Sequence, residues 1–105
     1  MNKNKLKLEL LDQLIEAVPN YPIIGCSEEV VENQDILYRN KSYTLDIEGA
    51  IVTVSKTIQD NKTYYDISAC LNEENSSPVS FSSEDLSSPL YQQLYNAIRK
   101  KYKNK

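Results

Sequence analysis

Three consecutive stretches between residues 42 and 71 alternate apolar and polar side chains, and this pattern constrains the fold more than any other feature. A period of two places successive side chains on opposite faces of a β-strand, so each stretch predicts a strand that is buried on one side only. The residues predicted to face the core are Tyr43, Leu45, Ile47, Ala50, Val52, Val54, Ile58, Tyr65, Ile67, Ala69 and Leu71. Lys56 breaks the alternation near the end of the second stretch.

Turn signals separate these stretches and indicate an antiparallel meander. Glu48-Gly49 and residues 59–62 have the residue types of tight hairpin turns. Residues 39–41, Arg-Asn-Lys, are a weaker turn signal before the first alternating stretch. Residues 19–34 predict a loop over the core, and a first strand starts either near Val30 or only at Ile36. The sheet therefore has three or four strands.

Apolar residues at a spacing of four predict a helix on each side of the strands. The first helix covers residues 5–18 and ends at Pro19 and Pro22, because proline cannot continue the hydrogen-bond ladder. Its apolar stripe consists of Leu6, Leu10, Leu14 and Val18, with Leu11 and Ile15 beside it. The second helix covers residues 89–102, with Ser88 as its N-cap and Pro89 at its first position. Its apolar stripe consists of Leu90, Leu94 and Ile98, flanked by Tyr91, Tyr95 and Tyr102.

These elements predict an α+β fold. A three- or four-stranded antiparallel meander lies between an N-terminal and a C-terminal helix, and both helices pack on the apolar face of the sheet. The length of 105 residues suits one domain, residues 1–105. The polar, serine-rich segment 72–88 is predicted to be a loop, and residues 99–105 form a basic C-terminal end.

The net charge of −3 hides an asymmetry along the chain. Eight of the 12 cations lie in residues 1–8 and 99–105, whereas all 15 acids lie between these segments. Such an acidic body repels nucleic acid and attracts basic protein surfaces. The cations of residues 99–105 complement the dipole of the second helix, which explains their position without a ligand. A phosphate-binding patch at this end is the alternative interpretation.

Several classes of chemistry lack their usual residues in this chain. It has no histidine, which removes histidine-based triads and histidine metal sites. Its only glycines, Gly25 and Gly49, cannot form a glycine-rich phosphate loop. Cys26 and Cys70 belong to no CxxC motif, and whether they pair stays open. We therefore expect no enzymatic activity, no cofactor and no metal site.

The N-terminal region resembles neither a membrane span nor a signal peptide. No apolar run approaches the roughly 18 residues that a membrane span needs. Glu9, Asp12 and Glu16 interrupt the region that follows the basic start of the chain. We expect a cytoplasmic protein that does not associate with membranes.

Acidic residues and tyrosines together predict a protein-binding surface. Tyrosine offers a large contact area with a polar end, and this chain has eight. Tyr64 falls on the polar sheet face beside Asp66. The predicted partner-binding residues are Asp46, Glu48, Tyr64, Asp66, Glu73 and Glu74. They predict a small, acidic, non-enzymatic binding or inhibitor protein that acts on a basic protein surface, such as the nucleic-acid groove of a nuclease, by DNA mimicry.

In size, acidity and predicted elements the chain is similar to small phage-encoded inhibitors of host defence nucleases, including anti-CRISPR proteins. This resemblance implies a viral or mobile-element protein that acts in the host cytoplasm. Two alternatives stay open. One is a nucleic-acid-associated module that uses the basic termini, although the acidic body argues against direct nucleic-acid binding. The other is a homo-oligomeric structural or assembly protein, for example a homodimer through a sheet edge or the C-terminal helix.

Overall fold

The computed structural model describes residues 3–71, 79–83 and 88–103. In chain order the elements are α1 (Lys3–Ala17), the 3-10 turn η1 (Val18–Asn20), β1 (Ile23–Glu32), β2 (Leu37–Ile47), β3 (Ala50–Gln59), β4 (Lys62–Leu71), β5 (Val79–Ser82) and α2 (Leu90–Lys103). The strands form one antiparallel sheet in the order β1-β2-β3-β4-β5. The predicted α+β meander between two terminal helices is confirmed, with five strands rather than three or four.

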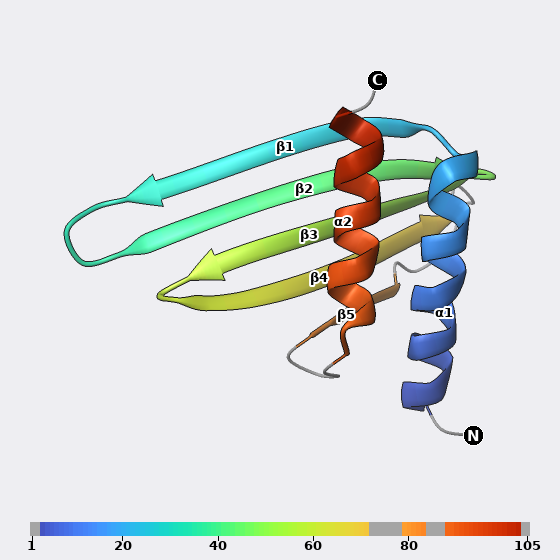
Figure 1. The fold of residues 1–105 in the computed structure, drawn as a ribbon, viewed down its shortest axis with the longest axis horizontal. Coiled ribbons are helices and arrows are strands. Elements are labelled where there is room, and N and C mark those ends of the chain that lie inside the picture. Colours follow the sequence, from blue (N-terminus) through green and yellow to red (C-terminus); the bar gives the residue numbers. More distant parts are fainter. Residues whose placement is uncertain (1–2, 72–78, 84–87, 104–105) are drawn as a thin grey trace.

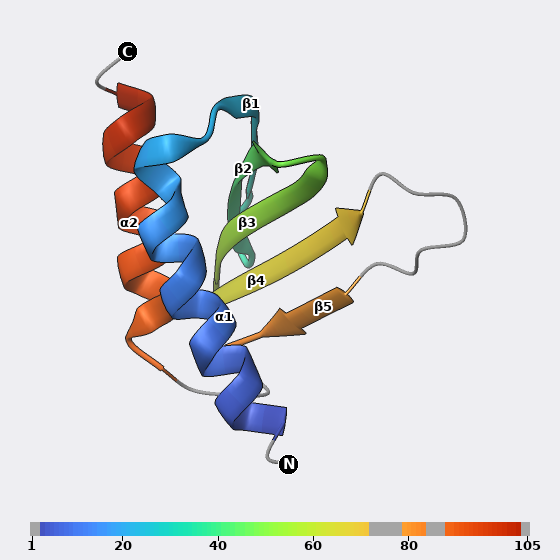
Figure 2. The same ribbon diagram turned by 90° about the vertical axis from the view of Figure 1, so that its right-hand side faces the viewer.

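Both helices cover the same face of the sheet, as predicted. They lie side by side and run in the same direction (Figures 1 and 2). One buried cluster joins them to the sheet, because period-two strands and spacing-four helices present matching apolar surfaces. Its members are Leu11, Leu14, Val18, Ile23, Tyr43, Leu45, Val52, Val54, Ile67, Tyr91, Leu94, Tyr95 and Ile98.

The apolar stripe of α1 is rotated relative to the prediction. Leu11, Leu14 and Val18 are buried, whereas Leu10 packs only at the margin and Leu6 is 48% exposed. The prediction was wrong for Leu6 because the first turn of α1 extends past the core, where no described element covers it. The helix ends at Ala17, and Pro19 lies in the 3-10 turn that follows, in agreement with the predicted stop.

The main correction concerns β1 and the start of β2. The first strand begins at Ile23 rather than near Val30 or Ile36, and it replaces most of the predicted loop. The turn lies at residues 33–36, where the Asn33 side chain accepts hydrogen bonds from the backbone N–H groups of Asp35 and Ile36. Residues 39–41 are therefore inside β2 and do not form the predicted turn. An edge strand exposed on both faces has no alternation, which explains why its sequence gave no strand signal.

The remaining turn predictions are confirmed, and a second short strand was missed. Glu48, Gly49, Asp60 and Asn61 all have positive φ, as the tightest hairpin turns require. Within the segment predicted to be a loop, residues 79–82 form β5, while residues 72–78 and 84–87 lie outside the described residues. Ser88 caps α2 by accepting a hydrogen bond from the backbone N–H of Leu90, as predicted.

Both cysteines are exposed and no disulfide joins them. Cys26 pairs with Tyr43 and so shares the helix-covered side of the sheet, whereas Cys70 pairs with Ile51 on the other side. No helix of the described chain is long and apolar enough to span a bilayer. The expectation of a cytoplasmic location stays a prediction.

Candidate functional site

Three of the four cations in the acidic body lie on the helix-covered side of the sheet. Arg39 and Lys41 have the same parity along β2 as buried Tyr43, and Lys56 has the same parity along β3 as buried Val54. The register pairs Lys41 directly with Lys56. These three side chains lie on the same face of the sheet as the core, at the end where the strands extend past the helices. The positive charges therefore border the core.

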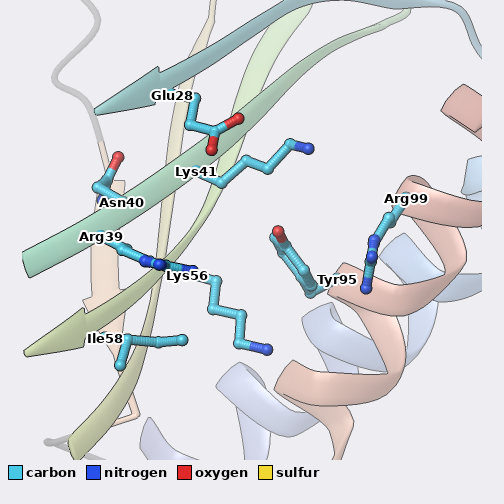
Figure 3. A pocket seen from close by; sticks show the side chains of 8 residues that line it. All are labelled: Glu28, Arg39, Asn40, Lys41, Lys56, Ile58, Tyr95 and Arg99. Carbon is cyan, nitrogen blue, oxygen red and sulfur yellow. The ribbon is translucent and has the colours of Figure 1, made fainter. Parts of the chain in front are cut away.

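Helix α2 completes the site from above the sheet. Tyr95 and Arg99 are four residues apart and therefore project from the same side of the helix. Tyr95 is buried at the margin of the core, whereas Arg99 is exposed. The burial of Leu94 and Ile98 fixes the rotation of α2, and this rotation directs Tyr95 and Arg99 toward Lys41 and Lys56 (Figure 3).

The residues from β1, β2, β3 and α2 enclose a cleft of about 350 Å³, which we call the basic cleft. It is lined by Glu28, Arg39, Asn40, Lys41, Lys56, Ile58, Tyr95 and Arg99. In Figure 3, Lys41 and Lys56 reach from the sheet toward Tyr95 and Arg99, while the Asn40 side chain turns away. Asn40 instead donates a hydrogen bond to Thr57 on the opposite side of the sheet, at 2.8 Å. The site thus holds four cations and one carboxylate.

Tyrosine rings stabilise the two ammonium groups. The Lys56 ammonium lies 5.5 Å from the ring centre of Tyr95 and 6.0 Å from that of Tyr65. The Lys41 ammonium lies 5.6 Å from the ring centre of Tyr43. The negative face of an aromatic ring attracts a cation at such distances. These contacts offset the repulsion that two lysines directly opposite each other on neighbouring strands would otherwise cause.

Lys41 stays protonated although cations surround it. Its pKa is raised, first by a polar interaction with the Tyr43 hydroxyl and also by the charge of Glu28, and these outweigh partial burial. The interaction falls short of hydrogen-bond geometry, because the buried Tyr43 hydroxyl has no hydrogen-bond partner among the described residues. Burial also raises the pKa of Tyr95 to about 12. Both groups therefore carry their protons at neutral pH, and the cleft stays positive.

The cations of the cleft are available to a ligand. The chain contains only two arginines, Arg39 and Arg99, and both line the cleft. Within residues 3–71, 79–83 and 88–103, none of the four cations forms an ion pair. A guanidinium group binds phosphate or carboxylate through two parallel hydrogen bonds, whereas an ammonium group acts as a compact charge. This combination is suited to an anionic group that carries several oxygen atoms.

The structure separates the predicted partner-binding residues. Asp46 accepts a hydrogen bond from the backbone N–H of Gly49 at 3.0 Å, and Glu48 accepts one from the Tyr21 hydroxyl at 2.9 Å. Both carboxylates therefore hold the β2–β3 turn. The bond to Glu48, together with its negative charge, raises the pKa of Tyr21.

Tyr64 and Asp66 lie on the same face as Asp46 but far along the sheet. Asp46 aligns with Cys70 two strands away, and Asp66 is four residues farther along β4. This offset corresponds to about 13 Å along the strands and about 10 Å across them. Hydroxyl groups fill the space between, with Ser42 and Ser55 2.7 Å apart and Thr44 and Thr53 3.3 Å apart. Glu73 and Glu74 lie outside the described residues, so the predicted acidic surface stays a prediction.

Lys56 was the sequence signal that pointed to the basic cleft. It occupies an inward position of an alternating strand, where an apolar residue is expected. Extending the same alternation backward from Tyr43 would also have placed Lys41 and Arg39 inward. The turn assigned to residues 39–41 hid this relation. Nothing in the sequence indicates that Arg99 meets them, because that contact depends on how α2 crosses the sheet.

Fold and site together define a two-layer α+β protein with an exposed basic cleft at the open end of the sheet. Comparison of the chain with protein-family models, curated proteins and solved structures found no match. No group of three or more metal-ligating side chains occurs in the part of the chain that the structure describes.

Proposed function

We propose that this chain is a non-enzymatic binding protein that takes a compact phosphate-bearing group in its basic cleft. The observation that carries the proposal is the convergence of both arginines with Lys41 and Lys56 on one cleft, opposed only by Glu28. Placing several like charges together is unfavourable in an isolated protein. A bound anion offsets this repulsion, and each guanidinium group can donate two parallel hydrogen bonds to two oxygens of a phosphate.

The size and lining of the cleft favour a ligand of nucleotide size. A volume of about 350 Å³ is at the small end of ligand pockets, which run from roughly 300 to 1,000 Å³. Tyr95 and Ile58 supply an aromatic and an aliphatic contact, and Glu28 can accept hydrogen bonds from sugar hydroxyl or base amino groups. The acidic remainder of the chain disfavours a long polyanion. We therefore propose a free nucleotide or the phosphorylated end of a nucleic-acid strand as the ligand.

Isothermal titration with two probes tests this proposal and separates the two sources. The probes are ADP and a 5′-phosphorylated single-stranded tetranucleotide. We expect saturable binding of at least one, weaker at higher salt, and about 10- to 100-fold weaker in the Lys56→Glu variant. Arg99→Lys keeps the charge but loses the double hydrogen bond, so we expect about tenfold weaker binding. A preference for the tetranucleotide would identify a nucleic-acid end.

Lys62→Glu and Lys5→Glu are the matched controls, because they make the same charge change at exposed positions outside the cleft. We expect both to bind like the wild type. Equal losses of affinity in these variants would show that affinity depends on net charge alone. That result would refute the proposal that the ligand binds in the basic cleft. Failure of both probes to bind the folded wild type would also refute it.

A second candidate function is recognition of a basic protein surface, in keeping with the inhibitor predicted from the sequence. One observation favours it. Strand β1 carries Glu28, Glu29 and Glu32 but no cation, and all three are exposed. With poly-L-lysine as the probe, we expect salt-sensitive binding that Glu29→Lys with Glu32→Lys weakens and that Glu9→Lys with Glu16→Lys on α1 leaves unchanged. Equal effects of the two double variants would exclude β1 as the binding surface.

A further inference from the structure

The β1–β2 hairpin extends beyond both helices and forms an arm at the open end of the sheet (Figure 1). We define this arm as residues 28–41. Aliphatic side chains are exposed along it, with Val30 47%, Val31 42% and Ile36 47% accessible. Val30 and Val31 are neighbours on a strand and therefore point to opposite faces. Among the described residues, no apolar side chains bury the exposed aliphatic residues on either face of the arm.

Within the part of the chain that the structure describes, the outer edge of β1 is the longer free edge of the sheet. Strand β1 has ten residues and pairs with β2 on one side only, whereas β5 at the other edge has four. An edge strand offers a row of unpaired backbone N–H and C=O groups to another chain. Proteins usually protect such an edge with charged side chains, proline or a bulge, and on β1 the only such feature beyond residue 25 is its glutamates. The only irregularity of β1 is at Ile23/Gly25, so the edge from residue 26 to residue 32 has no bulge.

The negative charge of β1 determines which kind of strand can pair with this edge. A second copy pairing antiparallel through β1 would bring six carboxylates onto one pair of strands, because each copy contributes Glu28, Glu29 and Glu32 without a cation. Like charges in cross-strand positions destabilise the pairing. A segment with lysine or arginine at positions three apart, on either side of two aliphatic residues, would instead place cations opposite Glu29 and Glu32, which lie on opposite faces of β1. Aliphatic residues in the same segment could then cover Val30 and Val31.

We propose that an extended basic segment of a partner protein adds to the outer edge of β1 as a sixth strand. This inference rests on the second candidate function and specifies how the partner binds. Backbone hydrogen bonds to β1 supply part of the affinity, and side-chain pairs supply the specificity. Glu29 and Glu32 pair with cations of the segment, whereas Val30 and Val31 contact its aliphatic side chains.

Amide hydrogen exchange of the full chain with an eight-residue peptide of two Lys-Val-Val-Lys repeats tests this mode, because this order places lysines opposite Glu29 and Glu32 and valines opposite Val30 and Val31. We expect the peptide to slow exchange at outward-facing amides of β1 and to leave the β5 edge unchanged. A peptide methylated on every second amide nitrogen keeps its charge but loses hydrogen bonds, so we expect little binding. Glu29→Lys with Glu32→Lys should weaken peptide binding at least about fivefold, and Glu9→Lys with Glu16→Lys should not change it.

The outcomes separate this inference from the function on which it rests. If poly-L-lysine binds through β1 but the methylated peptide binds equally well, or protection appears at β5, strand addition is wrong and the second candidate function stands. If neither poly-L-lysine nor the peptide binds, both fail. Light scattering that shows a dimer, with β1 amides protected in the absence of peptide, would identify a second copy as the occupant and overturn the proposal.

Discussion

Lys101 shows that one residue of the basic C-terminal segment serves the fold. Its ammonium group donates hydrogen bonds to the backbone carbonyl of Val18, at 2.7 Å, and to that of Tyr21. These carbonyls lie just past the end of α1, where helical hydrogen bonding leaves acceptors unpaired and the dipole favours a cation. Lys101 thereby joins the ends of the two helices. The positive charges of residues 99–105 therefore have different roles.

Replacing Lys101 with methionine keeps most of the length of the side chain and removes the charged donor. We expect the free energy of unfolding to fall by about 1.5–3 kcal/mol, because two carbonyls lose a charged donor. Urea denaturation measures this change. Lys100→Met is the matched control on an exposed position, where we expect less than about 0.5 kcal/mol. Equal losses in the two variants would contradict a specific role for Lys101.

Tyr95 gives the protein a pH dependence at the alkaline end. Burial first, and then the neighbouring Tyr43, raise the pKa of Tyr95 to about 12, compared with about 10 in an unfolded chain. The folded state keeps the phenol proton where the unfolded state loses it. This contribution to stability is therefore complete below about pH 10 and is lost as the pH rises toward 12.

We expect the urea midpoint of the wild type to fall between pH 10 and pH 12, and that of Tyr95→Phe to fall less steeply. Lysines also titrate in this range, but they are the same in both proteins. Tyr64→Phe on the opposite sheet face provides a matched control and should follow the wild type. A Tyr95→Phe curve parallel to the wild type would exclude this residue as the cause.

At the scale of elements, the sequence predicts the helices, strands and turns whose formation depends on a local pattern of residues. The helices, β2 from residue 42 onward, β3 and β4 follow from side-chain period, and the turns after β2 and β3 follow from residues that tolerate positive φ. Strand β1 could not be predicted in the same way, because its outer positions are exposed on both faces and its stability comes from pairing with β2. The short β5 likewise depends on tertiary bonds. Ser83 exchanges hydrogen bonds with the Tyr65 backbone, and the Tyr91 hydroxyl donates to the Ser82 carbonyl.

The two glycines provide a test at the scale of elements, because the backbone conformation requires glycine at only one of the two positions. Gly49 has φ +90°, which disfavours any side chain, so we expect Gly49→Ala to destabilise by roughly 1 kcal/mol. A Cβ added at Gly25 would lie 3.7 Å from Thr44 Cβ, an ordinary contact. We therefore expect Gly25→Ala to change stability by less than about 0.5 kcal/mol. Thermal unfolding of the two variants measures the difference, and the reverse order would be inconsistent with these backbone conformations.

For the whole molecule, the distribution of charges along the sequence did not predict which charged residues lie close together in the folded protein. The described parts of the basic ends, residues 3–8 and 99–103, lie at opposite ends of the helix pair (Figure 2). Of the predicted acidic residues, the described ones are likewise separated, with Asp46 and Glu48 at the β2–β3 turn and Asp66 in the middle of β4. The few cations of the acidic body gather instead, because strand pairing aligns Lys41 with Lys56 and α2 brings Arg99 to them. Such contacts depend on register and helix crossing, which composition does not determine.

The most direct test of the basic cleft uses the side-chain Nε–Hε signals of the arginines. The chain has only two arginines, so nuclear magnetic resonance should resolve two such signals. We expect both to shift together and saturably when pyrophosphate is added to the wild type, and to respond far less in Lys56→Glu. Binding in the basic cleft would be contradicted if only one arginine signal shifted. It would also be contradicted if the largest shifts of backbone signals lay in residues 3–7 or 100–103.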